Sequence, residues 1–216
     1  MLFRSKALGC DALLSASAVG SLREEDAPRR AVVPDQFIDR TRHRPDTFFG
    51  DGVVAHVSFA EPVCGSLARA LEEAAAAAGL PARLGRTYVC MEGPQFSTRA
   101  ESLLYRSWGA DVIGMTNLTE AKLAREAEIC YATLALVTDY DAWRASEQPV
   151  SVETVISILG ENSAAARRTM REAVARVDPA RGCSCRHALR FAILTDRGAI
   201  SEEARRRLAP LVGKYL

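Results

Sequence analysis

Short apolar runs bounded by turn residues alternate along this chain with longer segments of helical periodicity. Such alternation is typical of an α/β fold, and it predicts strands at Asp11–Val19, Ala31–Ile38, Val53–Phe59, Arg83–Glu92, Asp111–Met115 and Cys130–Thr138. The run from Tyr131 to Val137 is nearly continuous in apolar character, as expected for a central strand covered on both faces. The pattern therefore predicts an α/β domain in which residues 130–138 form a central strand.

The expected helices are recognised mainly by their ends. A proline at the start and a glycine after the end predict an alanine-rich helix between Pro62 and Gly79. Capping-box spacing, or its asparagine variant, predicts helices that open at Thr98 and at Asn117. Helical periodicity predicts two more, at Ser151–Val177, with Gly160 as a candidate interruption, and at Glu202–Val212.

Length and composition limit the classes of protein to consider. The chain has 216 residues, 48% hydrophobic and 25% charged, which fits one globular domain spanning residues 1–216. A formal net charge of +1 gives no reason to expect a nucleic-acid or anionic-membrane partner. Asp11 interrupts the apolar segment near the start, so we expect a buried strand there rather than a signal peptide.

Six cysteines bear on compartment and on metal binding. Four of them, Cys10, Cys64, Cys90 and Cys130, stand singly in apolar segments, where a reduced thiol behaves as a small hydrophobe; this favours a cytoplasmic protein. For the pair Cys183 and Cys185 three interpretations stay open: the two thiols oxidise, they bind a metal, or they do neither. A lone C-x-C lacks the second ligand pair of a zinc site, so we expect two free thiols in a loop and no metal.

Ligands in such folds gather where strands pass into loops and helices, and three such junctions are rich in polar or small residues. Residues 15–21 read as a small-residue turn whose backbone N–H groups can approach an anion. Residues 91–101 combine a Gly93-Pro94 turn with Phe96 in a loop. In the third junction, residues 138–143, Asp139 and Asp141 end a buried strand.

The two carboxylates allow two interpretations. Residues i and i+2 project from the same side of an extended chain, so Asp139 and Asp141 are expected to influence each other's titration. One group would then donate a proton while its neighbour accepts hydrogen bonds. The alternative is that both carboxylates only cap the turn after the strand, and spacing does not separate the two.

Five segments then occur in order along the chain, at Gly20–Glu25, Val33–Thr41, Glu92–Ser102, Trp108–Asn117 and Thr138–Trp143. Together they resemble the S-methyl-5'-thioadenosine phosphorylases of the purine-nucleoside phosphorylase family, over a span from about Ala7 to Ala175. The resemblance implies a three-layer α/β fold with a central mixed sheet flanked by helices. It also implies phosphate-dependent cleavage of S-methyl-5'-thioadenosine to adenine and 5-methylthioribose 1-phosphate, with inorganic phosphate as co-substrate and no cofactor.

The resemblance further implies roles for individual residues. Asp139 would protonate N7 of the departing adenine, and Asp141 would accept a hydrogen bond from the 6-amino group. It assigns purine and ribose contacts to Phe96, Ser97 and Met115, phosphate contacts to Ser17, Ala18 and Thr116, and the methylthio pocket to Val152, Val155 and Ile156. His56 would reach the 5' end from a neighbouring subunit, which implies a homotrimer. Without the resemblance, the apolar residues would be assigned to the core and His56 to a structural role.

The sequence also departs from the family pattern. The family begins with a strand and a glycine-rich phosphate loop and carries an Arg-His pair, and we expect the chain to lack these N-terminal elements. Phosphate binding would then be weaker. Two alternatives therefore stay open, a catalytically incompetent fragment of this family and a related purine-nucleoside phosphorylase with another substrate preference.

Overall fold

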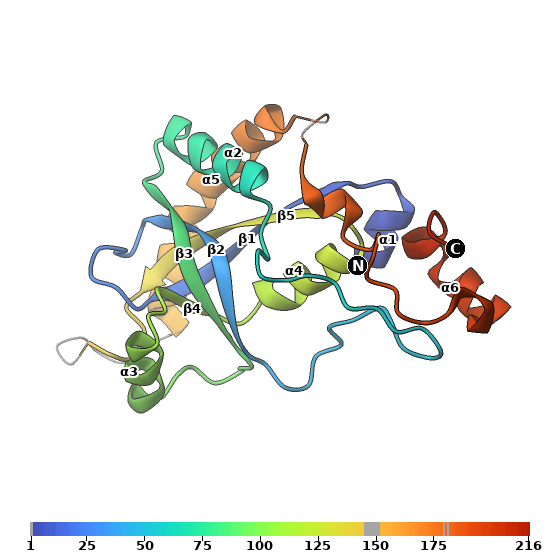
Figure 1. Ribbon diagram of the computed structural model, residues 1–216. Helices are drawn as coiled ribbons and strands as arrows, with labels where there is room; N and C mark the ends of the chain where they lie inside the picture. The colour runs from blue at the N-terminus through green and yellow to red at the C-terminus, as the bar shows by residue number, and fades with distance from the viewer. Residues whose placement is uncertain (1, 145–151, 179, 181) are drawn as a thin grey trace.

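Five strands carry the fold in the computed structural model, which describes residues 2–144, 152–178, 180 and 182–216 (Figure 1). The strands are β1 (Ala12–Ser21), β2 (Ala31–Arg40), β3 (Ala82–Met91), β4 (Val112–Gly114) and β5 (Cys130–Asp139). Their order is β1-β4-β3-β2-β5, and β1 also pairs with β5, so the sheet closes on itself. Parallel and antiparallel pairs are both present, which confirms the predicted mixed sheet.

The helices follow the same chain order. They are α1 (Leu2–Ala7), α2 (Gly65–Ala77), α3 (Arg99–Ser107), α4 (Asn117–Glu126), α5 (Val152–Arg176) and α6 (Glu202–Val212), with short 3-10 turns η1 (Ser184–His187) and η2 (Arg197–Ala199). Helix α6 has the predicted bounds. Helix α5 continues through Gly160, so the candidate interruption is wrong. None of the helices in the described residues is long and apolar enough to cross a membrane.

Strand β5 separates two helical layers, because its side chains point alternately to opposite faces. Ala132, Leu134 and Leu136 pack in one buried cluster with residues of α2 and α5. Tyr131 packs in a second cluster with residues of α4 and α6. Figure 1 shows α2 and α5 on one side of β5 and α4 on the other. Every residue of β5 except Asp139 is buried, and the predicted three-layer arrangement is confirmed.

Two of the predicted local structures are wrong. Residues 53–59 form no strand and make only isolated bridges, Gly50 with Val53 and Ala55 with Ile193; their alternating apolar pattern comes from packing on the C-terminal segment. Residues 15–21 are not a turn, because they belong to β1, in which residues 15–20 pair in parallel with β5 and residues 20–21 pair antiparallel with β4. The proposed anion-binding turn of backbone N–H groups is therefore replaced by an extended strand.

Of the two helix-capping predictions, the one for α3 is confirmed and the one for α4 is wrong. Thr98 and Glu101 form the complete predicted capping box of α3. Asn117 does not cap α4, since the N-cap residue is Thr116 and Asn117 is fully buried as the first helical residue. Helix α2 begins at Gly65, three residues after Pro62, and Gly79 follows it with a φ of 73°.

Candidate active site

A pocket of about 230 Å³ opens where β1, β4 and β5 end. It is lined by residues 17–20 of β1, by residues 113–116 in and after β4, and by Thr138, Asp139 and Asp141, with Met91 and Phe96 beside them. Mostly apolar walls with a few convergent polar groups are typical of small-molecule sites. The structure thus brings together residues from all three junctions that the sequence singled out.

A tight turn at the end of β5 holds the two carboxylates of the pocket. The backbone N–H of Asp141 donates to Oδ1 of Asp139 at 2.7 Å, and Thr138 Oγ1 donates to Oδ2 of Asp139 at 2.7 Å. Asp141 has a φ of 51°, so the carboxylates meet through a left-handed turn and not through the extended chain that the spacing suggested. Oδ2 of Asp141 is buried without a hydrogen-bond partner. Such an oxygen is costly unless a ligand donates to it.

Gly20 makes room for this carboxylate pair. A Cβ atom at Gly20 would lie 2.9 Å from Oδ1 of Asp139 and 3.2 Å from Cβ of Asp141. The register between β1 and β5 shifts between Val19 and Gly20, so the backbone of β1 passes close beneath the turn. Gly20 belongs to one of the segments that carry the resemblance, but the pattern there predicts no role for it. The close approach of two strands explains why a glycine stands at this position.

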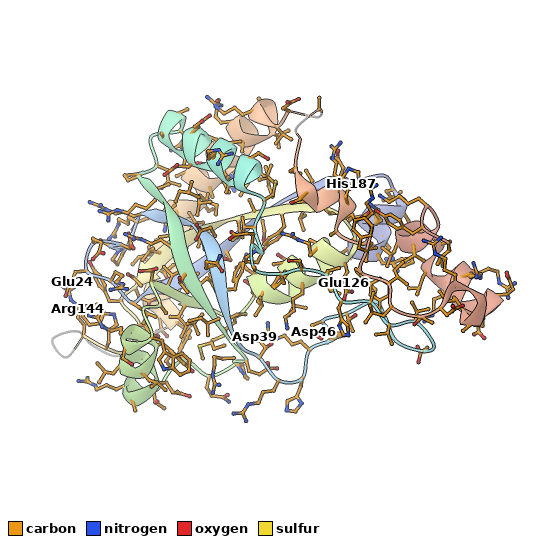
Figure 2. The ribbon with its side chains drawn as sticks, viewed as in Figure 1. Glu24, Asp39, Asp46, Glu126, Arg144 and His187 are labelled. Carbon is orange, nitrogen blue, oxygen red and sulfur yellow. The ribbon has the colours of Figure 1, made fainter. Side chains whose placement is uncertain are left out.

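The turn after β5 is fastened to the residues that follow β1. Trp143 Nε1 donates to the Ser21 carbonyl at 2.8 Å, and the guanidinium of Arg106 lies 3.6 Å from the centre of the Trp143 ring. Arg144 pairs with Glu24 at 2.8 Å, and the two side chains lie together in Figure 2. A surface ion pair adds little stability, so its main effect here is to fix the position of the turn.

Phe96 and Met115 supply apolar side chains to the pocket that the carboxylates also line. Phe96 is 47% exposed yet lines the pocket. Met115 lies against Gly93, where a Cβ atom would come within 2.6 Å of Met115 Sδ. Ser97, predicted as a substrate contact, is not among the pocket-lining residues and donates to Met91 Sδ at 3.7 Å.

Hydroxyl groups gather at the other end of the pocket. Ser17 Oγ and Thr116 Oγ1 both donate to Oδ1 of Asn117, at 2.7 Å and 3.0 Å. The amide nitrogen of Asn117 donates to Thr133 Oγ1 at 2.6 Å and to the Tyr131 hydroxyl at 2.9 Å. Buried Asn117 therefore orients both hydroxyls that the resemblance assigned to phosphate. The capping pattern predicted only a helix start at this asparagine and gave no sign of its position beneath the site.

Tyr88 is a second residue that sequence analysis did not find. Its hydroxyl accepts a hydrogen bond from the Thr116 N–H at 3.5 Å. Burial raises the pKa of Tyr88 to about 12, so the phenol stays neutral at physiological pH. Nothing in the local pattern of β3 distinguishes this tyrosine from a core aromatic residue.

Several predicted site residues do not line this pocket. Val152 and Ile156 are 58% and 63% exposed on α5 and lie outside it. The side chain of Val155 is outside the described part of the chain. His56 is exposed, and its backbone N–H donates to the Ala192 carbonyl at 2.9 Å. None of the three described side chains contributes to the pocket within this chain.

Comparison with known proteins shows the family to which this chain belongs. The sequence model of the phosphorylase superfamily matches residues 3–175, a range that contains every residue lining the pocket. A protein of Geobacter sulfurreducens named S-methyl-5'-thioadenosine phosphorylase is 55% identical over 216 residues, covering 100% of this chain and 76% of that protein. The chain belongs to the S-methyl-5'-thioadenosine phosphorylases of this superfamily. The resemblance seen in the sequence is thereby confirmed.

Other S-methyl-5'-thioadenosine phosphorylases are also similar to this chain in sequence and in structure. The protein of that name from Koribacter versatilis is 53% identical, covering 97% of this chain and 72% of that protein. A methylthioadenosine phosphorylase sourced from an antarctic soil metagenomic library superposes with a TM-score of 0.92 at 48% identity, over 97% of this chain and 75% of that one. The Schistosoma mansoni enzyme, solved in complex with adenine, superposes with a TM-score of 0.84 at 31% identity, over 89% of this chain and 76% of that one.

Proposed function

We propose that this chain is a pentosyltransferase that cleaves S-methyl-5'-thioadenosine with phosphate, giving adenine and 5-methylthioribose 1-phosphate. The observation that carries the proposal is the carboxylate pair at the end of β5, where a buried oxygen of Asp141 has no partner. An ionised carboxylate only accepts hydrogen bonds, so it suits the donor N–H of a 6-aminopurine. A 6-oxopurine would direct a lone pair at it.

In the proposed reaction, the purine lies between the carboxylates and the side chains of Phe96 and Met115. Asp139 gives a proton to N7 of the base, which leaves as neutral adenine while the ribose becomes oxocarbenium-like. Phosphate then forms the new bond to C1', so the ribosyl group passes from nitrogen to phosphate oxygen. This chemistry needs phosphate as co-substrate and neither a metal nor an organic cofactor.

The hydroxyl end of the pocket supports a phosphate position near Ser17, Ala18 and Thr116. Each hydroxyl has a single proton, which it donates to Asn117 in this structure, so both hydroxyls would turn from Asn117 to phosphate when phosphate binds. Among the described residues, the pocket lining includes no arginine, lysine or histidine. That observation favours a second candidate function, nucleoside binding without phosphorolysis, because a dianion is held best by cationic donors.

Purified chain 1–216 is expected to release adenine from S-methyl-5'-thioadenosine only when phosphate is present. Adenosine is expected to be a poorer substrate, and inosine poorer still, since its 6-oxo group faces Asp141. Chromatographic measurement of free base, with and without phosphate, checks this. Binding of the nucleoside without any phosphate-dependent release would refute the phosphorylase assignment for this chain and support the second candidate.

We further propose a homotrimer in which His56 of one protomer approaches the 5' end of the substrate in the next. The support is that His56 is exposed outside its own pocket, beside exposed apolar side chains of Val54, Phe191 and Leu194, which are 50%, 86% and 65% exposed. Val152, Val155 and Ile156 would then form the methylthio pocket together with the neighbouring protomer. Six cysteines that form no disulfide with one another support a cytoplasmic location, where the reaction would serve purine and methionine salvage.

Native mass spectrometry is expected to show three chains per particle, and Phe191→Asp is expected to shift the particle towards single chains with lower activity. A charge on this apolar side chain would oppose its burial between protomers. Leu8→Asp is the matched control, because Leu8 is an equally exposed apolar side chain, 83% exposed just after α1, and is not one of the residues assigned to this face. A fully active single chain would contradict the trimer.

A further inference from the structure

Four cysteines from three separate parts of the sequence meet on the α2 side of the sheet. They are Cys64 at the N-cap of α2, Cys130 at the first position of β5, and Cys183 and Cys185 at the start of η1. Their Sγ atoms all lie within 4.8 Å of one another, and the Sγ atoms of Cys130 and Cys183 are 3.2 Å apart. The second pair of thiols that the C-x-C motif lacked in the sequence is therefore supplied by the fold.

The spacing of these sulfur atoms fits tetrahedral coordination. Zinc binds thiolates at about 2.3 Å, so four sulfur atoms around one ion are separated by about 3.8 Å. The observed separations, from 3.2 Å to within 4.8 Å, bracket this value. Shifts of a few tenths of an ångström to about one ångström in the side chains would regularise the cluster around one ion.

The surroundings suit a buried tetrathiolate. Cys64, Cys130 and Cys185 are buried and Cys183 is half-buried, so the ligands are shielded from water. A neighbouring pocket, lined in part by Cys64, Cys183 and Cys185, gives an ion a path to the cluster. Arg69 and Arg125 line the same pocket together with Asp35 and Glu61, so the surroundings of the cluster are close to neutral and the case for an ion rests on the four thiols.

We propose that Cys64, Cys130, Cys183 and Cys185 bind one zinc ion at a structural site. Binding releases the four thiol protons to solvent and changes no oxidation state. None of the four cysteines lines the pocket described above, so the ion takes no part in the reaction. Its effect is mechanical, since it ties the segment after α5 to the first residues of α2 and β5.

Metal content of the full chain, purified under reducing conditions and dialysed, tests the site without any activity measurement. One zinc per chain is expected by elemental analysis. Replacement with cobalt(II) is expected to give the intense absorption of tetrahedral cobalt with four thiolate ligands. Cys183→Ser and Cys64→Ser are expected to lose stoichiometric zinc and this spectrum, whereas Cys10→Ser, at an exposed cysteine outside the cluster, is expected to keep both.

Zinc titration of the metal-free, unmodified chain keeps the proposal testable if the serine variants do not fold. Under reducing conditions, added zinc is expected to raise the melting temperature, and magnesium is not. A chain that retains no zinc and melts at the same temperature with and without it would overturn the proposal. So would a mass lower by two or four hydrogens in protein purified without reductant and free of zinc, because the cluster would then consist of disulfides.

Discussion

Asp139→Asn is expected to lower kcat/KM for phosphorolysis by about 10²- to 10⁴-fold, the usual contribution of a positioned general acid. Oδ1 of Asp139 accepts the Asp141 N–H, and the amide oxygen of asparagine can do the same, so the turn is preserved. The amide cannot give up a proton to N7, so the base must leave as an anion. Most of the loss is therefore expected in kcat rather than in KM, as measured by initial rates of adenine release.

Two further variants make this result specific. Asp141→Asn removes no proton donor but turns an N–H towards the 6-position, so it is expected to weaken binding of 6-aminopurines and to improve inosine relative to adenosine. Asp51→Asn is the control, because Asp51 also has a left-handed backbone, with a φ of 47°, and its side chain is 92% exposed. If the Asp139→Asn chain were as active as the Asp51→Asn chain, a group other than Asp139 would have to protonate N7 of the base.

Gly114→Ala is expected to lower the free energy of unfolding by about 3 kcal/mol, at the upper end of the cost of overpacking a core. A Cβ atom at Gly114 would lie 2.1 Å from the Tyr88 hydroxyl oxygen, 2.7 Å from Tyr88 Cζ and 3.2 Å from Val19 Cγ1. Tyr88 and Val19 are 0% and 1% exposed, so neither side chain can move aside without disturbing the core. Urea denaturation followed by circular dichroism measures the change.

Gly160→Ala provides the matched control for that substitution. Gly160 lies within α5, and nothing stands within 4 Å of an added Cβ atom there. Alanine in place of an exposed helical glycine is expected to raise the free energy of unfolding by about 0.5–1 kcal/mol. Equal stability of the Gly114→Ala and Gly160→Ala chains would show that β4 can separate from β3 and β1 at little cost.

The sequence predicted those elements whose pattern depends on their immediate neighbours. Strand β5 was recognisable because burial on both faces requires an unbroken apolar run, and α3 because Thr98 and Glu101 are close enough to cap one another. Residues 53–59 were wrongly predicted as a strand. Alternation of apolar and polar residues shows that one face of a segment is buried, but it does not show which part of the chain covers that face. A loop that packs on the C-terminal segment produces the same pattern as an edge strand.

Part of the pocket lining was named from the sequence, but its geometry was not. Asp139 and Asp141 were identified by spacing and by resemblance, but the left-handed turn that joins them depends on the tertiary surroundings. Asn117 was misjudged because its helix-capping pattern is local, whereas its bonds to Ser17 and Thr133 span distant strands. The four-cysteine cluster was unpredictable for the same reason, since Cys64 and Cys130 approach Cys183 only in the folded chain.

Under the proposed role of Asp141 in base recognition, the contact of Arg106 with Trp143 links substrate choice to helix α3. Arg106 belongs to α3, stacks on the tryptophan and also donates to the Leu22 carbonyl, so one side chain braces both the turn that carries Asp141 and the segment after β1. Under that proposal, a substitution that repacks α3 is expected to move the turn and to change which bases are accepted. Helix packing and base preference in this chain are consequently not free to evolve independently.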